Sequence, residues 1–349
     1  MSLHDHIVGR IAAQGPMRID EYMTTCLLHP TLGYYTTRDP LGVQGDFTTA
    51  PEISQMFGEL IGLSLGQSWM DSGAPSPFTL AELGPGRGTL MADALRACAR
   101  VPGFLAAAQM VLVEASPALK SAQAKTLEGT EVHWADSVEE LPQKPLFLIA
   151  NEFFDVLPIR QFLCDGGGWR ERQVGLDGDQ LVFGLGPVQP QPALPDAEAG
   201  DLVETCAALA PTMDPIAQRL RDHGGTALVI DYGDWQTKGD TLQALRSHEK
   251  VSPLETPGQA DLTAHVNFSA LAEAATGCTV SALTPQGVFL ERLGITARAQ
   301  ALALKLSGPA RDSHIAAHRR LTHPAEMGNL FKVMALTGKD SVPPPGVQP

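Results

Sequence analysis

The spacing of apolar residues along the chain predicts alternating strands and helices in its central part. Short apolar runs bounded by turn residues are typical of buried strands, and four stand out: Phe78–Ala81, Met110–Val113, Leu146–Ala150 and Thr226–Ile230. Segments with helical spacing separate them, and Leu330–Leu336 predicts a final, antiparallel strand. Because strands that alternate with helices form parallel sheets, the pattern predicts the α/β class.

A further helix is predicted before the first strand. Pro51 occupies a position favoured at the start of a helix, and the apolar residues that follow it have helical spacing. In this helix glycine recurs every fourth residue, at Gly58, Gly62 and Gly66. Glycine costs up to about 1 kcal/mol per helical position, so we predict that the glycine face packs closely against another backbone.

The chain is expected to divide into three parts. Residues 1–75 are expected to form an N-terminal helical cap with a loop that covers the cofactor. Residues 76–337 are expected to form the catalytic domain, with a β-hairpin and loop insertion at about 161–200 and a second insertion at about 236–275. The Pro-rich tail, 338–349, is expected to be disordered.

The run from Glu82 to Thr89 joins the first predicted strand to a helix. Glycine at every second position lets the backbone turn tightly and approach a ligand closely. A dinucleotide loop typically has the spacing G-x-G-x-x-G, which receives a pyrophosphate at the helix N-terminus, whereas this loop reads G-x-G-x-G after an acidic residue. An acid suits the ammonium of S-adenosylmethionine, and a helix N-terminus suits its carboxylate. The residues expected to bind this cofactor here are Glu82, Gly84, Pro85, Gly86, Gly88 and Thr89. The alternative is a plain glycine-rich turn.

Two more acids extend the expected cofactor site. Glu114 ends the second strand, where a carboxylate can accept hydrogen bonds from both ribose hydroxyls. Asp136, close to the aromatic Trp134, is expected to hold the adenine, with a surface turn as the equal alternative. The proposed roles of Glu114 and Asp136 require no metal ion, and we expect no metal site in this protein.

The run Asn151–Asp155, of sequence Asn-Glu-Phe-Phe-Asp, follows the strand predicted at Leu146–Ala150. Ligands of doubly wound sheets lie outside the carboxyl ends of the strands, and Asp231 marks another such end. We expect Asn151 to contact the cofactor and the two phenylalanines to exclude water and face a cation. Glu152 and Asp155 can hold a basic acceptor. A polar turn with a phenylalanine core contact is the alternative.

Composition limits the function classes. The chain has 25 basic and 39 acidic residues, a net charge of −14, which argues against a nucleic-acid partner and suits a basic one. The five cysteines are scattered and form no C-x-x-C pair, so a reducing compartment is favoured and a zinc site is not expected.

The sequence also bears on location. We expect no integral membrane segment and no leader. We therefore expect the protein to be located in a bacterial cytoplasm.

Five motifs together resemble the MidA family: Gly45–Gln55, Glu82–Met91, Asn151–Asp155, Asp231–Gly233 and Gln286–Leu290. The resemblance runs over nearly the whole chain. It implies a seven-stranded, doubly wound Rossmann-like sheet, S-adenosylmethionine as cofactor and methylation of a protein arginine. It also implies a respiratory complex I subunit as one possible protein partner, because the mitochondrial family member modifies such a subunit.

Within this hypothesis Glu152 is the guanidinium anchor, Asp155 is the weaker candidate and Asp46 assists from the N-terminal loop. Alternatives remain open at this point: a small-molecule methyltransferase, a non-catalytic assembly factor that binds S-adenosylmethionine, and a nicotinamide oxidoreductase, which the glycine spacing disfavours. A homodimer is one oligomeric state that the sequence allows.

Overall fold

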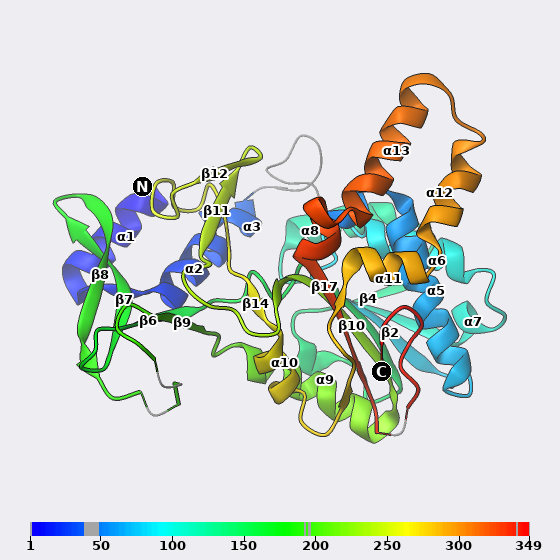
Figure 1. Cartoon of the computed structure of the whole chain (residues 1–349), viewed down its shortest axis with the longest axis horizontal. Helices are drawn as coiled ribbons and strands as arrows, with labels where there is room; N and C mark the ends of the chain where they lie inside the picture. Colours follow the sequence, from blue (N-terminus) through cyan, green and yellow to red (C-terminus); the bar gives the residue numbers. More distant parts are fainter. Residues whose placement is uncertain (1, 38–48, 192, 195–196, 340, 349) are drawn as a thin grey trace. The chain divides into compact units, whose positions relative to one another are not determined.

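The structure, a computed structural model, describes residues 2–37, 49–191, 193–194, 197–339 and 341–348. Figure 1 shows the chain coloured along its sequence. The chain forms two compact units, each built from three segments. Unit 1 comprises residues 1–47, 155–209 and 236–265, and unit 2 comprises residues 48–154, 210–235 and 266–349.

Unit 2 contains the central sheet and the helices that flank it (Figure 1). Its strands are β2 (Phe78–Leu83), β3 (Ala108–Val113), β4 (Val132–Ala135), β5 (Leu146–Asn151), β10 (Gly225–Asp234), β14 (Val266–Asn267), β15 (Thr279–Val280), β16 (Thr284–Pro285) and β17 (Phe331–Thr337). Its helices are α4 (Ala50–Ile53), α5 (Gln55–Asp71), α6 (Thr89–Cys98), α7 (Phe104–Ala107), α8 (Pro117–Thr126), η1 (Val138–Glu140), α9 (Leu209–His223), α10 (Phe268–Ala274), α11 (Gln286–Arg292), α12 (Ile295–Ala303), α13 (Gly308–Thr322) and η2 (Pro324–Gly328).

The central sheet is mixed. Its strands follow the order β15-β17-β10-β5-β2-β3-β4, with β14 pairing β10 and β16 pairing β17 beside this path. Strand β2 pairs in parallel with β3 and β5, and β10 pairs in parallel with β5. Strand β17 is antiparallel to β10, as predicted. The α/β class is therefore confirmed, and β2, β3, β5 and β10 all end at one edge, which we call the carboxyl edge.

The glycine face of α5 packs against α6. A Cβ on Gly62 would lie 2.6 Å from the Cα of Ala94, and one on Gly58 would lie 2.7 Å from the Cβ of Asp93. The predicted close packing of this face is thus present. The prediction of one helix from Pro51 is wrong, because Ser54 adopts an extended backbone and caps α5, which separates α4 from α5.

Unit 1 surrounds a separate apolar core. Its strands are β1 (Met17–Arg18), β6 (Arg160–Cys164), β7 (Trp169–Asp177), β8 (Gln180–Gln189), β9 (Leu202–Thr205), β11 (Gln243–Arg246), β12 (Glu249–Val251) and β13 (Asp261–Thr263). Its helices are α1 (Leu3–Gln14), α2 (Ile19–Leu28) and α3 (Tyr34–Thr37). The predicted hairpin is present as β7 and β8, which pair antiparallel. Strand β1 pairs with β7, which ties the N-terminal helices to this insertion.

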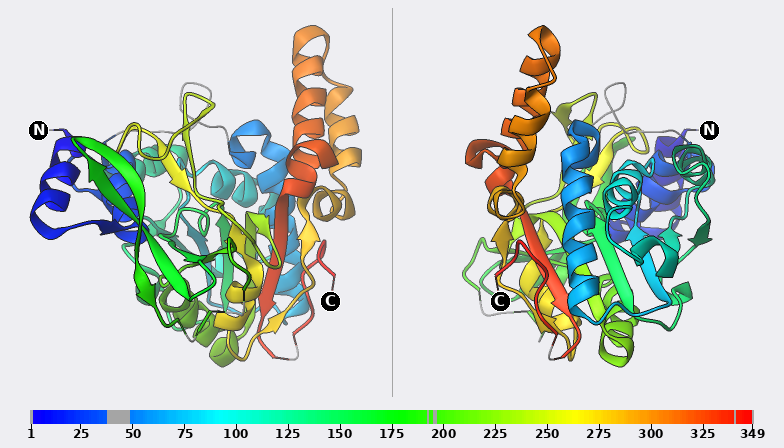
Figure 2. Two further views of the ribbon diagram at one scale, coloured as in Figure 1. Left: turned by 60° about the vertical axis from the view of Figure 1, so that its left-hand side comes forward. Right: turned by 90° about the vertical axis from the view of Figure 1, so that its right-hand side faces the viewer.

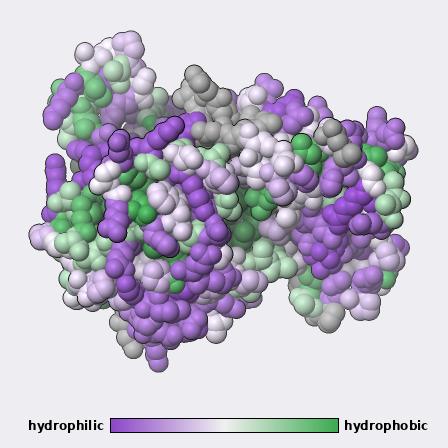
Figure 3. Space-filling model, turned by 180° about the vertical axis from the view of Figure 1, so that it is seen from behind, coloured by the Kyte–Doolittle hydropathy of each residue, from purple (hydrophilic) through white to green (hydrophobic). Residues whose placement is uncertain are grey.

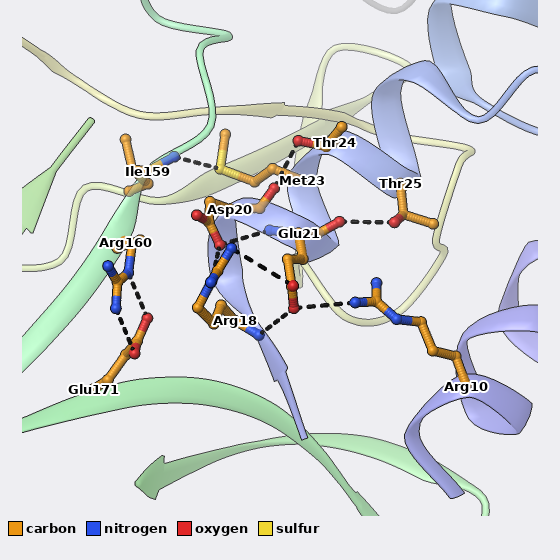
Figure 4. Close-up of polar contacts among 10 residues, drawn as sticks. All are labelled: Arg10, Arg18, Asp20, Glu21, Met23, Thr24, Thr25, Ile159, Arg160 and Glu171. Atoms are coloured by element: carbon orange, nitrogen blue, oxygen red, sulfur yellow. Dashed lines mark hydrogen bonds and ion pairs between the residues drawn. The ribbon is translucent and has the colours of Figure 1, made fainter. Parts of the chain in front are cut away.

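A polar cluster fixes the start of α2 within unit 1 (Figure 4). Arg18 precedes the helix, and its N–H and guanidinium bind the carboxylate of Glu21. Arg10 of α1 reaches the same carboxylate at 3.2 Å. On the neighbouring strands Arg160 donates two hydrogen bonds to Glu171, at 2.7 and 2.8 Å. These charges are only partly buried, so they orient the elements more than they stabilise them.

The C-terminal segment differs from the expectation of disorder. Gln348 forms a β-bridge with Ala282, and the carbonyl of Pro345 accepts a hydrogen bond from Ser64 at 2.8 Å. Arg292 also donates to the carbonyl of Gly346. Prolines prevent regular secondary structure in this segment. Its backbone carbonyls nevertheless accept hydrogen bonds from other residues of unit 2, and these bonds hold the segment in place.

Candidate active site

The loop between β2 and α6 depends on its three glycines. Gly84, Gly86 and Gly88 have φ values of +56°, +53° and +82°, a region that favours glycine. A Cβ on Gly84 would also lie 3.0 Å from the ring of Phe153. Gly88 forms the N-cap of α6 in the left-handed conformation. The loop therefore exposes backbone at the carboxyl edge, where the sequence predicts the cofactor.

Glu82 is buried beneath this loop. Its side chain is 3 % exposed, and burial raises the pKa of its carboxyl to about 8. A hydrogen bond from the backbone N–H of Met91 has the opposite, smaller effect on this pKa. Within the described ranges, its Oε2 has no hydrogen-bond partner. A buried oxygen without a partner costs about 1–3 kcal/mol, so this atom fits a polar group of a bound ligand.

Glu82 predicts a pH dependence of stability. Its carboxyl has an ordinary pKa of 4.5 and a folded-state pKa of about 8. Between these values the folded protein retains a proton that the unfolded chain releases, so the stability of the ligand-free protein falls as pH rises. Melting temperatures measured from about pH 5 to about pH 9 should show this fall. Glu82→Gln should flatten it; an equally steep curve in that variant would contradict the assignment.

Glu114 follows β3, and its carboxylate is held on both oxygens. Its Oε1 accepts from the N–H of Ser116 at 2.8 Å, and its Oε2 accepts from Nε2 of Gln123 at 3.1 Å. Burial raises the pKa of Glu114, and these hydrogen bonds lower it. The carboxylate is thus positioned at the carboxyl edge, next to the residues of the glycine loop.

Gln123 of α8 is a site residue that the motifs missed. It is fully buried, and its Nε2 also donates to the carbonyl of Gly86 at 2.8 Å. Its Oε1 accepts from Nε1 of Trp134 at 2.8 Å. Gln123 thereby joins the glycine loop, Glu114 and β4. One signal could have revealed it: Gln123 stands at the helical spacing of Leu119 and Leu127, where an apolar residue is expected.

Asp136 and Thr89 have other partners in the structure. The carboxylate of Asp136 is 76 % exposed and pairs with Lys120 at 2.5 Å. The hydroxyl of Thr89, at the start of α6, donates to Oε1 of Glu52 at 2.6 Å. This bond connects the glycine loop to α4. The predicted contacts of Asp136 and Thr89 with the cofactor stay predictions.

The turn after β5 holds Asn151 and Glu152. Glu152 has φ +52°, a rare conformation for a residue with a side chain. Its Oε1 accepts from the N–H of Ala50 at 3.2 Å and from Nδ2 of Asn151 at 3.1 Å. Asn151 is 8 % exposed, and its Oδ1 has no partner in the part of the chain that the structure describes. Asn151 therefore offers a second buried oxygen at the carboxyl edge.

Asp231 of β10 shapes the same turn. Its Oδ2 accepts from the N–H groups of Phe153 and Phe154, at 3.2 and 3.0 Å. The two rings meet edge to face, with centroids 5.2 Å apart. The sequence marked Asp231 as a strand end, and the structure adds its role: it holds the backbone that carries Glu152. Backbone strain at such turns persists only where the surroundings fix it.

Asp155 falls in unit 1 of the chain. Asp46 lies outside the described residues. Asp155 is 5 % exposed, and its carbonyl accepts from the N–H of Ala264 at 2.9 Å. The phenol of Tyr35 donates to Asp261 at 2.8 Å. Burial, and then the charges of Asp261 and Asp155, raise the pKa of Tyr35 well above its ordinary value. The buried Asp155 and Asp261 and the half-buried Tyr35 thus form one polar cluster in unit 1.

The glycine loop and the buried acids Glu82 and Glu114 lie at the carboxyl edge of a mixed sheet. This arrangement is typical of methyltransferases that bind S-adenosylmethionine, and comparison with known proteins gives the same class. Residues 60–286 match the family described as "Putative S-adenosyl-L-methionine-dependent methyltransferase". The chain belongs to this family, in its MidA-like branch. The protein therefore uses S-adenosylmethionine.

Named relatives cover nearly the whole chain. Protein arginine methyltransferase NDUFAF7, mitochondrial, is 37% identical in Danio rerio, over 96% of this chain and 86% of the relative. The Homo sapiens protein of that name is 38% identical, over 95% of this chain and 82% of the relative. A Burkholderia thailandensis structure bound to S-adenosyl-homocysteine has a TM-score of 0.83 and 29% identity, covering 96% of this chain and 91% of that one.

Metal binding and membrane insertion are two further functions to consider. Among the residues that the structure describes, no three His, Cys, Asp or Glu side chains are grouped so that they could bind a metal ion. None of the described helices combines the length and apolar character needed to cross a membrane.

The residues of unit 2 fit S-adenosylmethionine. Glu82 Oε2 and Asn151 Oδ1 are among the buried oxygens that lack a hydrogen-bond partner within the described residues, and these two lie at the carboxyl edge. Oxygen acceptors suit the ammonium and the hydroxyl groups of this cofactor. Buried acceptors are costly without donors, and a ligand that donates hydrogen bonds there would satisfy both atoms.

Proposed function

We propose that this protein methylates the side chain of a protein arginine. The relatives named protein arginine methyltransferase, at 37–38% identity over nearly the full chain, support the acceptor class. The unpartnered oxygens of Glu82 and Asn151 support the cofactor position. The family resemblance makes a respiratory complex I subunit the first acceptor to test, and a bacterial cytoplasmic location stays a prediction.

Residues of unit 2 would hold the cofactor. Glu82 and Asn151 would accept from its amino-acid group, and Glu114 from its ribose, with Gly84, Gly86 and Gly88 exposing the loop backbone. Pro85, Thr89 and Asp136 complete the proposed set. When bound, S-adenosylmethionine supplies an electrophilic methyl group on its sulfonium.

Glu152 is the proposed anchor for the guanidinium. Guanidinium remains protonated at physiological pH, and a carboxylate binds it bidentately. A carboxylate fixed in place directs one guanidinium nitrogen toward the methyl group and draws positive charge toward the other two. Such orientation can lower the activation free energy by roughly 7–11 kcal/mol. Glu152 is fixed by its hydrogen bonds from Ala50 and Asn151. Asp155 is the weaker candidate for this role, and Asp46 is proposed to assist; a carboxylate must also accept the proton that methylation releases.

The variant Glu152→Gln tests the anchor. Glutamine keeps an oxygen that can accept from Ala50 but loses the charge, so we expect methyl transfer to fall about 100-fold or more. S-adenosylmethionine affinity, measured separately by calorimetry, should change less than about threefold. Methyl transfer at the wild-type rate would refute the role of Glu152.

Labelled S-adenosylmethionine and a host lysate test the acceptor. Lysate from a strain that lacks this gene keeps its acceptor sites unmodified, and mass spectrometry then identifies the labelled polypeptide and residue. A labelled arginine in a protein is the expected result. Label in a small molecule would favour a small-molecule methyltransferase, and no transfer from bound cofactor would favour a non-catalytic assembly factor.

A further inference from the structure

Helices α12 and α13 form a hairpin that projects from unit 2 (Figures 1 and 2). Of the 15 residues of α13, only Leu321 is buried, and in α12 only Ile295 and Ala299 are. Most helical stability in proteins comes from packing an apolar face. A helix as exposed as α13 has most of its surface available to a partner.

The hairpin is basic on an acidic chain. Residues 295–323 hold five basic residues and one acidic residue, whereas the rest of the chain holds 20 basic and 38 acidic residues. Arg298 pairs with Glu59 and Arg319 pairs with Glu326. Over the described ranges, Lys305, Arg311 and Arg320 form no ion pair, and all three are exposed.

Apolar side chains accompany these charges. Leu304, at the tip, is 89 % exposed, and Ile315 of α13 is 52 % exposed. Seen from behind, the hairpin surface alternates hydrophilic and hydrophobic residues (Figure 3). Protein interfaces commonly combine an apolar anchor with surrounding charges.

The base of the hairpin lies at the carboxyl edge. Phe331, the first residue of β17, pairs with Tyr232 near the end of β10, and α13 and η2 come directly before it. Helix α13 also contacts α4, whose Glu52 binds Thr89 of the glycine loop. A protein bound to the hairpin would therefore be held at the cofactor's edge of the sheet.

We propose that the α12–α13 hairpin is the docking surface for an acidic face of the protein that accepts the methyl group. This inference rests on the proposed function. Lys305, Arg311 and Arg320 attract the acidic face, and Leu304 and Ile315 contact apolar groups beside it. The acidic remainder of the chain repels an extended polyanion such as a nucleic acid or an anionic bilayer, whereas a compact acidic patch can meet the hairpin alone.

The test compares two charge reversals of equal size. Arg311→Glu/Arg320→Glu changes the hairpin, and Arg100→Glu/Lys125→Glu changes exposed residues elsewhere on unit 2. The probe is the protein that the wild type labels in the lysate experiment. The hairpin variant should raise KM for this acceptor about 10-fold or more, with kcat and S-adenosylmethionine affinity unchanged. The control variant should match the wild type.

A second variant and a second probe complete the test. Ile315→Ser, which alters no charge, should also raise the acceptor's KM, and added salt should raise KM more for the wild type than for the charge-reversed hairpin. If the wild type labels no protein, the proposed function fails. If it labels one and the hairpin variants keep the wild-type KM, the docking surface alone is refuted. Hairpin-dependent binding to phosphatidylglycerol vesicles or to a second copy, with unchanged KM, would refute it too.

Discussion

Replacing Gly84 with valine should raise the dissociation constant for S-adenosylmethionine about 100-fold or more. Gly84 has φ +56°, which is strained for a β-branched residue, and its added Cβ would lie 3.0 Å from the ring of Phe153. Relief of this contact must move the glycine loop or the turn that carries Glu152. Titration calorimetry of the purified variant measures the loss.

Gly129→Val is the matched control for that variant. Gly129 also has a left-handed backbone, φ +83°, but a Cβ there has no atom within 4 Å. It should cost about 1–3 kcal/mol of stability through strain alone and leave the affinity for S-adenosylmethionine intact. Equal affinities of the Gly84 and Gly129 variants would show that the glycine loop does not hold the cofactor.

The second large effect concerns stability. Gly62→Ala should lower the free energy of unfolding by about 2–4 kcal/mol, because its Cβ would lie 2.6 Å from the Cα of Ala94 and α5 and α6 must separate. The same substitution at Gly9 should raise it by about 0.5–1 kcal/mol, since Gly9 lies in a helix with open space around it. Thermal unfolding of both variants checks the opposite signs; a stable Gly62→Ala protein would contradict the packing argument.

The sequence was most informative where local patterns determine structure. The apolar runs at 78–81 and 146–150 predicted strands that the structure contains, and the polar residues that follow them do meet at one edge of the sheet. The four-residue period of glycine in α5 likewise predicted its packing. These features follow from backbone geometry over a few residues.

Features that depend on distant residues were not predictable. Gln123 looks like an ordinary polar helix residue until Gly86 and Trp134 are placed beside it. The backbone of Glu152 is left-handed because Asp231, 79 positions along the chain, fixes the amides that follow it. The break at Ser54 was missed because helical spacing of apolar residues continues through it.

Strand β17 sets the order in which the chain can complete its sheet during synthesis. Its residues 331–337 leave the ribosome after those of every other described strand of this sheet, yet they pair with β10 along seven positions and stand between β10 and β15. Until then the edge of β10 is open, and open strand edges invite aggregation. A nascent chain that stops before 331 should therefore depend on chaperones, because the edge of β10 stays unpaired.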